Sequence, residues 1–514
     1  MRKLWIPAAA ILAFVLSAPA TAGAVQFTDG VASGDVTSTR AVLWTRVDVA
    51  DNIKVEGWTN ADLSGPKAFK GKFFTTAARD YTVKIDVTGL TPNTQYWYRF
   101  RKDEDFSPVG TFKTAPDSNT SANLRLDYTG DSDVVKINGV PAVNNFEVLN
   151  ALKNENPDAW VYLGDTIYAD SQFRPTPATT LDEYRDLYRE GRTYSNLTNL
   201  LSATSTYATW DDHEVVDDYD AATVNPAQYA AGRQAFFEWM PIRETGLPHD
   251  PSCAGDPIYR KFSWGKDVDV FMLDERSCRS AEGDAACLGD LAPTLPTAAR
   301  QLFPFNFFLS PSPPAGCLTA LNNPSRTLLG PVQKAQFKND LLNSTAQYKL
   351  IVSQDPIQQF FVLPYDRWEG YPAERSEILN FIRNNGIDNT LFLTTDTHAT
   401  LQNQVFMDRF TDPATISNEM VTGPIATTTF ANEVIGVAGV IGLFAVNAAL
   451  DVFTGMDCRH LDKNSYATVD VTAGGTTTIT SKDDQGNPVI GFAPNTTNPG
   501  IPGPTLPCTG TYGP

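Results

Sequence analysis

The chain has 514 residues, of which 42% are hydrophobic and 11% aromatic, so it is long enough for two or three folded domains and too apolar for a disordered protein. Its 40 basic and 59 acidic residues leave a net charge of −19, which excludes nucleic acid as a stable partner because the phosphates would be repelled. Such an acidic surface is compatible with the binding of hard cations.

The N-terminus has the pattern of an export signal. Arg2 and Lys3 precede a short apolar run, Ile6–Leu16, and small residues that suit cleavage follow in Ala18–Ala24. We therefore expect residues 1–24 to be a signal peptide and the mature protein to be secreted, either extracellular or periplasmic. A membrane anchor is the alternative, but the run is too short to span a bilayer, so we expect no transmembrane anchor after cleavage.

Residues 25–116 are predicted to form a small all-β sandwich. Short strands separated by turn residues are expected at Arg40–Val47, Lys54–Thr59, Tyr81–Val87 and Gln95–Arg101. The segment Leu90–Tyr96 resembles the tyrosine-corner strand of fibronectin type III domains, in which the tyrosine hydroxyl binds the backbone of the corner.

Residues 117–485 are predicted to form an α/β layered domain, because short apolar strands alternate with helices. Strands are expected at Leu124–Thr129, Ala159–Leu163, Asp267–Leu273, Tyr348–Val352 and Thr390–Thr394, and a closing hairpin at Tyr466–Val471 and Thr476–Thr480. Helices are expected at Phe146–Asn154, Leu181–Glu190, Pro226–Trp239, Val332–Leu342 and Glu374–Asn384.

Two segments near the C-terminus stand apart from this pattern. Residues 486–514 are rich in Pro, Gly and Thr, and we expect an extended surface tail there. Val434–Val446 is an uncharged run, too short to span a bilayer, that contains three glycines. One interpretation of this run is a helix or loop packed on the core; the other is a lid over the site or a lipid-facing patch.

The cysteine count fits an exported protein. Six cysteines, an even number, predict three disulfide bonds. We expect Cys458 to pair with Cys508, and the other four, Cys253, Cys278, Cys287 and Cys317, to connect the middle of the chain.

Acidic residues and one histidine follow three of the predicted strands. Asp131 comes after Leu124–Thr129, Asp165 comes after Ala159–Leu163, and Asp396 and His398 come after Thr390–Thr394. Ligands of α/β proteins bind at the carboxyl ends of strands, so these side chains are predicted to share one site. Each Asp alone would be an ordinary turn residue.

A fourth cluster lies in Thr209–Glu214, where three carboxylates flank His213 in a chain with only four histidines. A solvated acidic loop is the plain interpretation. The functional interpretation is a metal-binding carboxylate, Asp212, beside a catalytic imidazole whose pKa the neighbouring carboxylates raise.

These residues resemble the metallophosphoesterase pattern, and most closely that of the alkaline phosphatase D family. The resemblance extends from about residue 27 to residue 480. It rests on Gly164–Tyr168, Trp210–Glu214 and Asp396–His398, with support from Gly30–Asp35, Leu43–Arg46, Met240–Arg243, Met272–Arg276, Leu329–Gln333 and Trp368–Pro372.

The resemblance implies a fold, an activity and a set of ligands. The fold would be an α/β/β/α domain behind a fibronectin-like sandwich. Asp165 would bridge two metal ions, Tyr168 would be a phenolate ligand to a ferric ion, and Asp212 would bind the second metal. His213 would contact the leaving group or the phosphoryl group, and Asp396 and His398 would be further metal ligands.

The sequence departs from the family pattern at two points. Family members place a Cys on the first metal, but no Cys precedes Cys253 here, so Asp131 is the best substitute and Asp133 the second. The oxygen-rich set favours hard cations such as Fe³⁺, Ca²⁺, Mn²⁺ or Mg²⁺. The resemblance implies two or three metal ions, Fe³⁺ and Ca²⁺ first, with Mn²⁺, Mg²⁺ or Zn²⁺ as alternatives. Arg2-Lys3 replaces the twin arginine common in the family, so general secretion and export of the folded protein both remain open.

Two arginines are candidates for substrate binding. Arg276 and Arg279 follow the strand Asp267–Leu273, and a guanidinium fork there would bind phosphate. A surface ion pair is the plain interpretation of the same residues.

The sequence thus predicts a secreted, monomeric enzyme that hydrolyses small phosphate monoesters through a metal-activated hydroxide. A phosphodiesterase, including phospholipase D-type cleavage at a phospholipid head group, is the alternative on the same fold. A non-catalytic secreted calcium-binding protein is the alternative from another class, but structural calcium sites are usually one local loop, whereas these ligands lie in four separated clusters.

Overall fold

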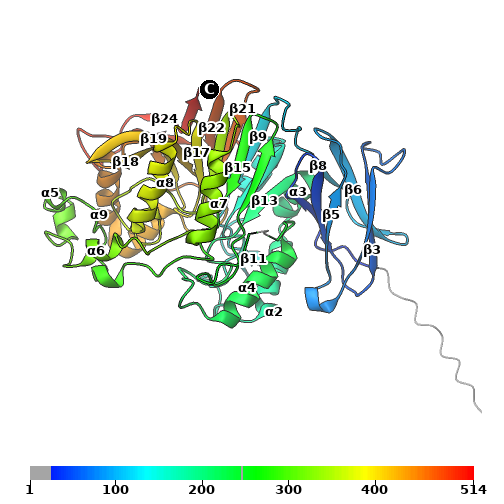
Figure 1. The fold of residues 1–514 in the computed structure, drawn as a ribbon. Coiled ribbons are helices and arrows are strands. Elements are labelled where there is room, and N and C mark those ends of the chain that lie inside the picture. The colour runs from blue at the N-terminus through cyan, green and yellow to red at the C-terminus, as the bar shows by residue number, and fades with distance from the viewer. Residues whose placement is uncertain (1–24, 245–246, 514) are drawn as a thin grey trace, which may run out of the picture.

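The computed structural model describes residues 25–244 and 247–513, so the predicted signal peptide lies outside the described residues. Those residues form two large facing sheets with a β-sandwich at one end (Figure 1). The first sheet runs in the order β25 (Thr509–Tyr512), β22 (Thr477–Lys482), β21 (Tyr466–Val471), β9 (Leu124–Thr129), β12 (Ala159–Leu163), β13 (Ser205–Thr209), β1 (Val31–Gly34), β2 (Arg40–Arg46) and β5 (Thr82–Thr88).

The second sheet faces the first. It runs in the order β14 (Arg260–Trp264), β15 (Val268–Met272), β16 (Tyr348–Val352), β17 (Thr390–Thr394), β19 (Asp412–Val421), β18 (Thr400–Asp408), β20 (Met456–His460), β23 (Ile490–Phe492) and β24 (Thr505–Pro507). β15, β16, β17 and β19 are mutually parallel, as are β9, β12 and β13 in the first sheet.

Alternation along the central strands explains the layers. In β12, Val161 points between the sheets and Trp160 points outward. In β16, Leu350 points between the sheets and Ile351 points outward. Successive side chains of a strand point to opposite faces, so strands that are apolar throughout need cover on both sides. Because both faces of these strands are buried, their sequences are uninterrupted apolar runs.

Helices provide the outer cover. On the first sheet lie α1 (Glu147–Asn154), α2 (Leu181–Gly191), α3 (Ser195–Ala203) and α4 (Pro226–Trp239); on the second lie α7 (Gly330–Leu342) and α8 (Pro372–Asn384). The expected α/β/β/α order is therefore confirmed, and the predicted helices coincide with these to within a few residues. The short α5 (Thr297–Arg300) and α6 (Cys317–Leu321) lie in a long connection between β15 and α7.

The N-terminal sandwich packs its own core between β1, β2 and β5 and a second sheet made of β4 (Phe69–Phe74), β3 (Asn52–Trp58), β6 (Gln95–Lys102), β7 (Asp105–Phe106) and β8 (Gly110–Lys113). The Thr91 amide donates to the Tyr96 hydroxyl at 2.9 Å, so the predicted tyrosine corner is present. One feature was not expected: β1 pairs in parallel with β13, so the sandwich and the α/β domain share a continuous sheet.

The C-terminal residues differ from the expected surface tail. β23 pairs with β20 and β25 pairs with β22, so the segment extends both large sheets. A sequence rich in Pro and Gly hides this, because edge strands tolerate residues that a central strand does not. The predicted Cys458–Cys508 bond is present and ties the segment to β20; the remaining cysteines form Cys253–Cys278 and Cys287–Cys317.

The uncharged run Val434–Val446 is part of a longer helix, α9 (Phe430–Val452), with non-helical backbone at Gly439 (φ 65°). Its buried face, including Val434, Val446 and Ala449, joins a core cluster, whereas Val437 and Val440 are 83% and 72% exposed. By length and composition alone, α9 is the one helix among the described residues that is apolar enough to cross a membrane, with a mean hydropathy of 2.0. The structure thus confirms that one face of this run packs on the core, whereas a lid or lipid-facing role for the exposed face stays a prediction.

Candidate active site

The carboxyl ends of the parallel strands meet at one edge of the two sheets. Acidic residues follow five of these strands at the site: Asp131 follows β9, Asp165 follows β12, Asp212 follows β13, Asp355 follows β16 and Asp396 follows β17. This is the arrangement that the strand-end rule predicts, and it brings together residues up to 265 positions apart from Asp131 to Asp396.

The first group of ligand-type side chains contains Asp131, Asp165 and His398, whose donor atoms all lie within 4.8 Å of one another. The Tyr168 hydroxyl lies 3.1 Å from His398 Nε2, so the phenol belongs to the same group. Two carboxylates, an imidazole and a phenol thus converge on one point.

The second group contains Asp165, Asp212 and His213, again with donor atoms within 4.8 Å of one another. Asp165 is common to both groups and is only 2% exposed. A carboxylate has two oxygens, so a residue in this position can contact two neighbouring cations at once.

Backbone conformation at the strand ends is unusual. Asp131, Asp165, Asp396 and His398 all have positive φ, at 64°, 48°, 61° and 53°. Asp and His tolerate this left-handed region better than most residues, but it still costs free energy and clusters at functional sites. The tight turns aim these side chains back across the ends of the strands.

Asp131 and Asp133, the two substitutes considered for the missing Cys, have different surroundings. Asp133 accepts hydrogen bonds from Ser171 Oγ at 2.5 Å and from the Val135 amide at 3.0 Å, so it holds a loop in place. Asp131 Oδ2 is buried and has no hydrogen-bond partner within residues 25–244 and 247–513. Burial raises the pKa of Asp131 to about 7, although His398 opposes the shift. Of the two residues, Asp131 therefore fits the place of a cation ligand better.

His213 is oriented by a residue that the sequence did not single out. Its Nδ1 lies 2.6 Å from Asp170 Oδ1, and its ring stacks on Tyr168 at 4.0 Å between centroids. Burial lowers the pKa of His213, but Asp165, Asp212 and Asp170 together outweigh it and hold the pKa well above the ordinary value of 6.5. This shift favours the protonated imidazole, and Asp170 leaves its Nε2 free for another partner.

Replacing Asp170 with Asn should lower kcat by about 10- to 100-fold, the usual effect of losing a residue that orients a functional histidine. The pKa of His213 should fall because a carboxylate is removed, so the alkaline limb of the pH–rate profile should move to lower pH. Asp217→Asn is the matched control: Asp217 is 68% exposed and lies 3.8 Å from His213 Nε2. An unchanged pH profile in Asp170→Asn would contradict the assigned role.

His398 has its own carboxylate partner, Glu433, on α9. Glu433 Oε1 lies 2.6 Å from His398 Nδ1, which directs Nε2 toward Tyr168 and Asp131. Burial lowers the pKa of His398, but Glu433, Asp131 and Asp396 raise it to about 9. No local sequence signal pointed to Glu433, because α9 comes to the site from another part of the fold.

Arg276 and Arg279, expected to bind phosphate, are fully buried among carboxylates. Arg276 donates to Asp211 through Nε and to Asp366 through Nη1 at 2.8 Å and Nη2 at 3.2 Å. Arg279 donates to Tyr371 and Glu282. In these contacts the two guanidinium groups offset the charge of the acidic site, and their role toward phosphate stays a prediction.

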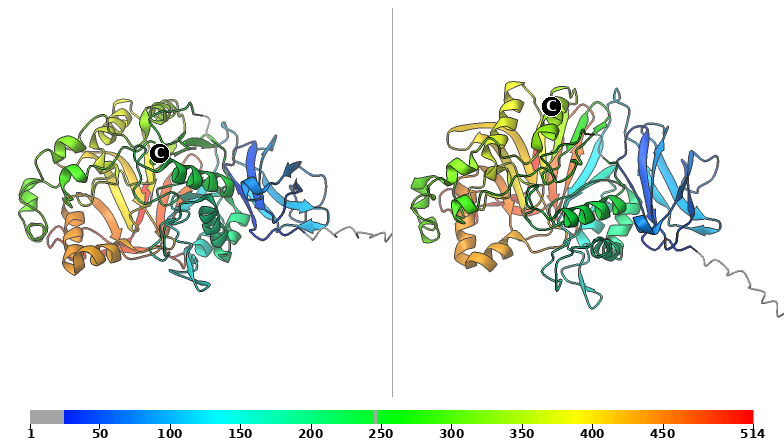
Figure 2. Two further views of the ribbon diagram at one scale, coloured as in Figure 1. Left: turned by 90° about the horizontal axis from the view of Figure 1, so that it is seen from below. Right: turned by 60° about the horizontal axis from the view of Figure 1, so that its bottom comes forward.

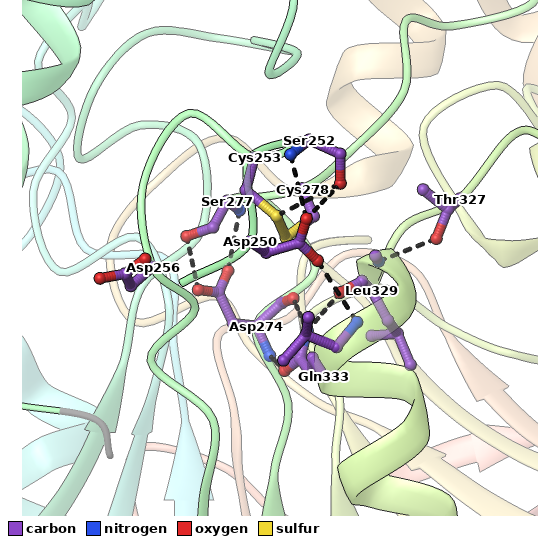
Figure 3. The surroundings of a disulfide bond; sticks show 12 residues. Asp250, Ser252, Cys253, Asp256, Asp274, Ser277, Cys278, Thr327, Leu329 and Gln333 are labelled. Atoms are coloured by element: carbon purple, nitrogen blue, oxygen red, sulfur yellow. Dashed lines mark hydrogen bonds between the residues drawn. A yellow bond between two sulfur atoms is a disulfide. The ribbon is translucent and has the colours of Figure 1, made fainter. Parts of the chain in front are cut away.

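The loop after β15, which carries Arg276, is held in place by hydrogen bonds and a disulfide, and Figure 3 shows Asp274, Ser277, Gln333 and Cys278 in these contacts. Asp274 accepts from the Ser277 amide and hydroxyl at 2.9 and 2.6 Å, and Gln333 on α7 bonds both the amide and the carbonyl of Asp274. The Cys253–Cys278 bond ties the end of this loop to the segment before β14. The Met272–Arg276 motif therefore fixes the backbone of the loop that carries Arg276 beside the site.

Asp355 was missed by the sequence analysis, although it comes three residues after a predicted strand. It is fully buried, and neither carboxylate oxygen has a hydrogen-bond partner in the described part of the chain. Arg276 Nη2 and Arg279 Nη1 lie 3.8 and 3.9 Å away. Burial and Asp366 raise its pKa well above the ordinary value.

The donor set fits hard cations. Buried carboxylates that lack donors, Asp131 and Asp355 among them, are costly unless a positive charge offsets them. Oxygen donors outnumber the two imidazoles, and the described residues place no thiolate at the site because each cysteine is in a disulfide. This composition suits Fe³⁺, Ca²⁺, Mn²⁺ or Mg²⁺ better than a soft metal.

Two facing sheets covered by helices, with acidic residues and histidines at the carboxyl ends of their strands, define a phosphoesterase of the metallophosphoesterase-like fold. The chain matches the family model described as PhoD-like phosphatase over residues 138–478, and that of the PhoD-like phosphatase N-terminal domain over residues 14–116. It belongs to the PhoD-like phosphatase family.

Known relatives agree with this assignment. Alkaline phosphatase D of Bacillus subtilis (strain 168) is 27% identical over 435 residues, which cover 77% of this chain and 68% of that protein. A solved structure of PhoD has a TM-score of 0.73 and 23% identity, covering 95% of this chain and 90% of its own. Purple acid phosphatase PPD1 from seeds of yellow lupin (Lupinus luteus) has a TM-score of 0.55 and 11% identity, covering 95% and 74%. The two structural likenesses show the fold.

Proposed function

We propose that the protein is an exported, metal-dependent phosphomonoesterase whose centre is built from Asp131, Asp165, Tyr168, Asp212, Asp396 and His398. The observation that carries this proposal is the position of Asp165, which is shared between two adjacent groups of ligand-type side chains. Such a pair of sites suits phosphate ester hydrolysis, because two adjacent cations can together activate the attacking oxygen and stabilise charge on the phosphoryl and leaving oxygens.

Metal ions bound there would activate a water molecule and stabilise charge on the phosphoryl and leaving oxygens. Side chains of the protein would transfer the proton and keep the site in place. His213 Nε2 would donate a proton to the leaving oxygen, and Asp170 would hold the ring in the orientation for that transfer. Arg276 would fix Asp211 and Asp366 and so keep this acidic region compact without a bound substrate.

The metals we propose are Fe³⁺ and Ca²⁺, with Mn²⁺, Mg²⁺ or Zn²⁺ as alternatives. Tyr168 supports a ferric ion on its side of Asp165, since a phenolate is a hard ligand and the Tyr168 hydroxyl is fully buried beside Asp131 and His398. Asp212 supports a hard divalent ion on the other side, because its carboxylate lies within 4.8 Å of the donor atoms of Asp165 and His213.

Export is supported by the disulfides, which form and persist outside the cytosol. We propose a signal peptide at residues 1–24, a sandwich at 25–116, a catalytic domain at 117–485 and a C-terminal segment at 486–514. A monomer is the state we expect. Membership of a phosphatase family favours an enzyme over the calcium-binding alternative.

A phosphodiesterase is the second candidate function. It is favoured by an apolar pocket beside Glu433, because a diester carries a second organic group that must be accommodated next to the phosphate.

One experiment tests these proposals together. The metal content of the purified protein should be measured, and p-nitrophenyl phosphate should be compared with bis-p-nitrophenyl phosphate as substrate. Asp131→Ala should lose one class of metal, whereas Asp133→Ala, the matched control, should keep its metal. Failure to hydrolyse either ester after reloading with iron and calcium would contradict the proposed function.

A further inference from the structure

An apolar pocket of about 270 Å³ lies under α9. Its walls come from α9 and from two other segments. They include Phe430 and Val434 on the helix, Leu291 and Phe305 in the connection between β15 and α7, and Val362 after β16. Figures 1 and 2 show α9 beside α5 and α6, at the end of the molecule away from the N-terminal sandwich.

The pocket adjoins the candidate active site through α9. Glu433 lines the pocket and bonds His398 Nδ1 at 2.6 Å, and the Phe430 amide donates to the His398 carbonyl at 3.1 Å. His398 Nε2 in turn lies 3.1 Å from the Tyr168 hydroxyl. Through Glu433 the pocket lining thus contacts His398, which is itself a member of the first ligand group.

We propose that this pocket binds the hydrocarbon chain of an amphiphilic phosphate ester while its phosphate occupies the metal centre. The proposal rests on the proposed function and extends it by naming the substrate class. Among the described residues that line the pocket, Glu433 is the one charged side chain, and it lies on the side of the active site. The other side chains that line the pocket are apolar, so they can pack against methylene groups but cannot form hydrogen bonds with a polar group.

The concave shape selects a single chain over the other possible occupants of an apolar surface. Phe305 and Phe430 are buried in the pocket walls, whereas a flat surface for a bilayer or a second copy would expose them. The kink at Gly439 bends α9, and Ala438 and Gly442 on either side of it leave the pocket open because their side chains are small.

Alkylphosphonates of two, four, six and eight carbons provide the test, as competitive inhibitors of whichever p-nitrophenyl ester the enzyme hydrolyses. Each added methylene that enters the pocket should lower Ki by about two- to fourfold, so octylphosphonate should bind at least about tenfold more tightly than ethylphosphonate. The measurements are made with the metal-loaded full chain, below the concentration at which the inhibitors aggregate.

Ala438→Trp should fill the pocket and reduce the ratio of the ethyl to the octyl Ki to about threefold or less. Val440→Trp is the matched control: it places the same side chain two residues further on, where Val440 is 72% exposed and does not line the pocket. Phe308→Ser, on the opposite wall, should reduce the ratio without adding bulk to α9. Calorimetric binding of octylphosphonate gives a second readout.

The outcomes are distinct. A Ki that does not change with chain length in an enzyme that hydrolyses p-nitrophenyl esters would overturn the pocket and leave the proposed function intact. Absence of any turnover would point to failure of the proposed function instead. A chain-length effect that appears only above the aggregation concentration, or that depends on protein concentration, would assign the surface to a bilayer or to a second copy and also overturn the proposal.

Discussion

Asp165→Asn is expected to remove both metal ions and to lower kcat by about three orders of magnitude or more, because several kcal/mol of charge stabilisation depend on them. Of the two ligand groups described above, Asp165 takes part in both, whereas Asp131 and Asp212 take part in one each; Asp212 also lies in a further acidic group with Asp217 and Asp218. Asn keeps the size of Asp and tolerates its φ of 48°, so the turn itself should survive.

The contrast between variants makes this prediction specific. Asp131→Asn should lose only the metal beside Tyr168 and His398, and Asp212→Asn only the metal beside His213. Metal analysis of the three proteins, together with their circular dichroism spectra, separates these losses from misfolding. Retention of both metals by Asp165→Asn would show that its carboxylate does not bridge them.

Removal of the metals should destabilise the protein, and more so as the pH rises. The pKa of Asp131 is raised from 3.8 to about 7 in the folded state. Between these values the unfolded chain has released a proton that the folded chain still holds, so the stability of the metal-free protein falls as the pH rises from about 4 to 7. Asp131 alone accounts for about 4 kcal/mol at most.

His398 acts in the same direction at higher pH. Its pKa is raised from 6.5 to about 9, so the stability that it contributes is present below pH 6.5 and is lost as the pH rises through 9. Bound cations reverse the trend, because they favour the ionised carboxylates and the neutral imidazole. The difference in Tm between loaded and chelated protein should therefore be larger at pH 8.5 than at pH 5.

Thermal melts at the two pH values, with and without chelator, measure this difference. Asp131→Asn provides the control, because an amide does not titrate and the fall between pH 4 and 7 should become smaller. Equal Tm differences at both pH values would mean that the buried carboxylates are not the groups that the metals stabilise.

The parts of the site that lie near predicted strands could be found from the sequence. Asp165 and Asp396 follow short apolar runs, and burial on both faces makes such runs easy to detect. Asp355 follows such a run too, and only the lack of a matching motif kept it out of the predicted set. The alternation of strands and helices likewise sufficed for the layered fold.

Features that depend on distant contacts could not be found in this way. Glu433 reaches His398 because α9 packs against the loop after β17, and nothing within the helix indicates that partner. Arg276 has the chemistry of a phosphate ligand, but its neighbours Asp211 and Asp366 are 65 and 90 positions away. The strands near the C-terminus were missed because their pairing, unlike their composition, is long-range.

The sheet shared by the sandwich and the catalytic domain limits how the protein can be divided. A Cβ atom on Gly34 would lie 2.5 Å from the Thr206 carbonyl, and Asp35 lies 3.2 Å from Arg260, so the junction is tightly packed. A protein truncated to begin near residue 116 would lack β1, so one edge of β13 would be unpaired and open to self-association. We therefore expect that the N-terminal sandwich cannot be deleted or moved to another protein without loss of folding, because the two regions fold as one unit.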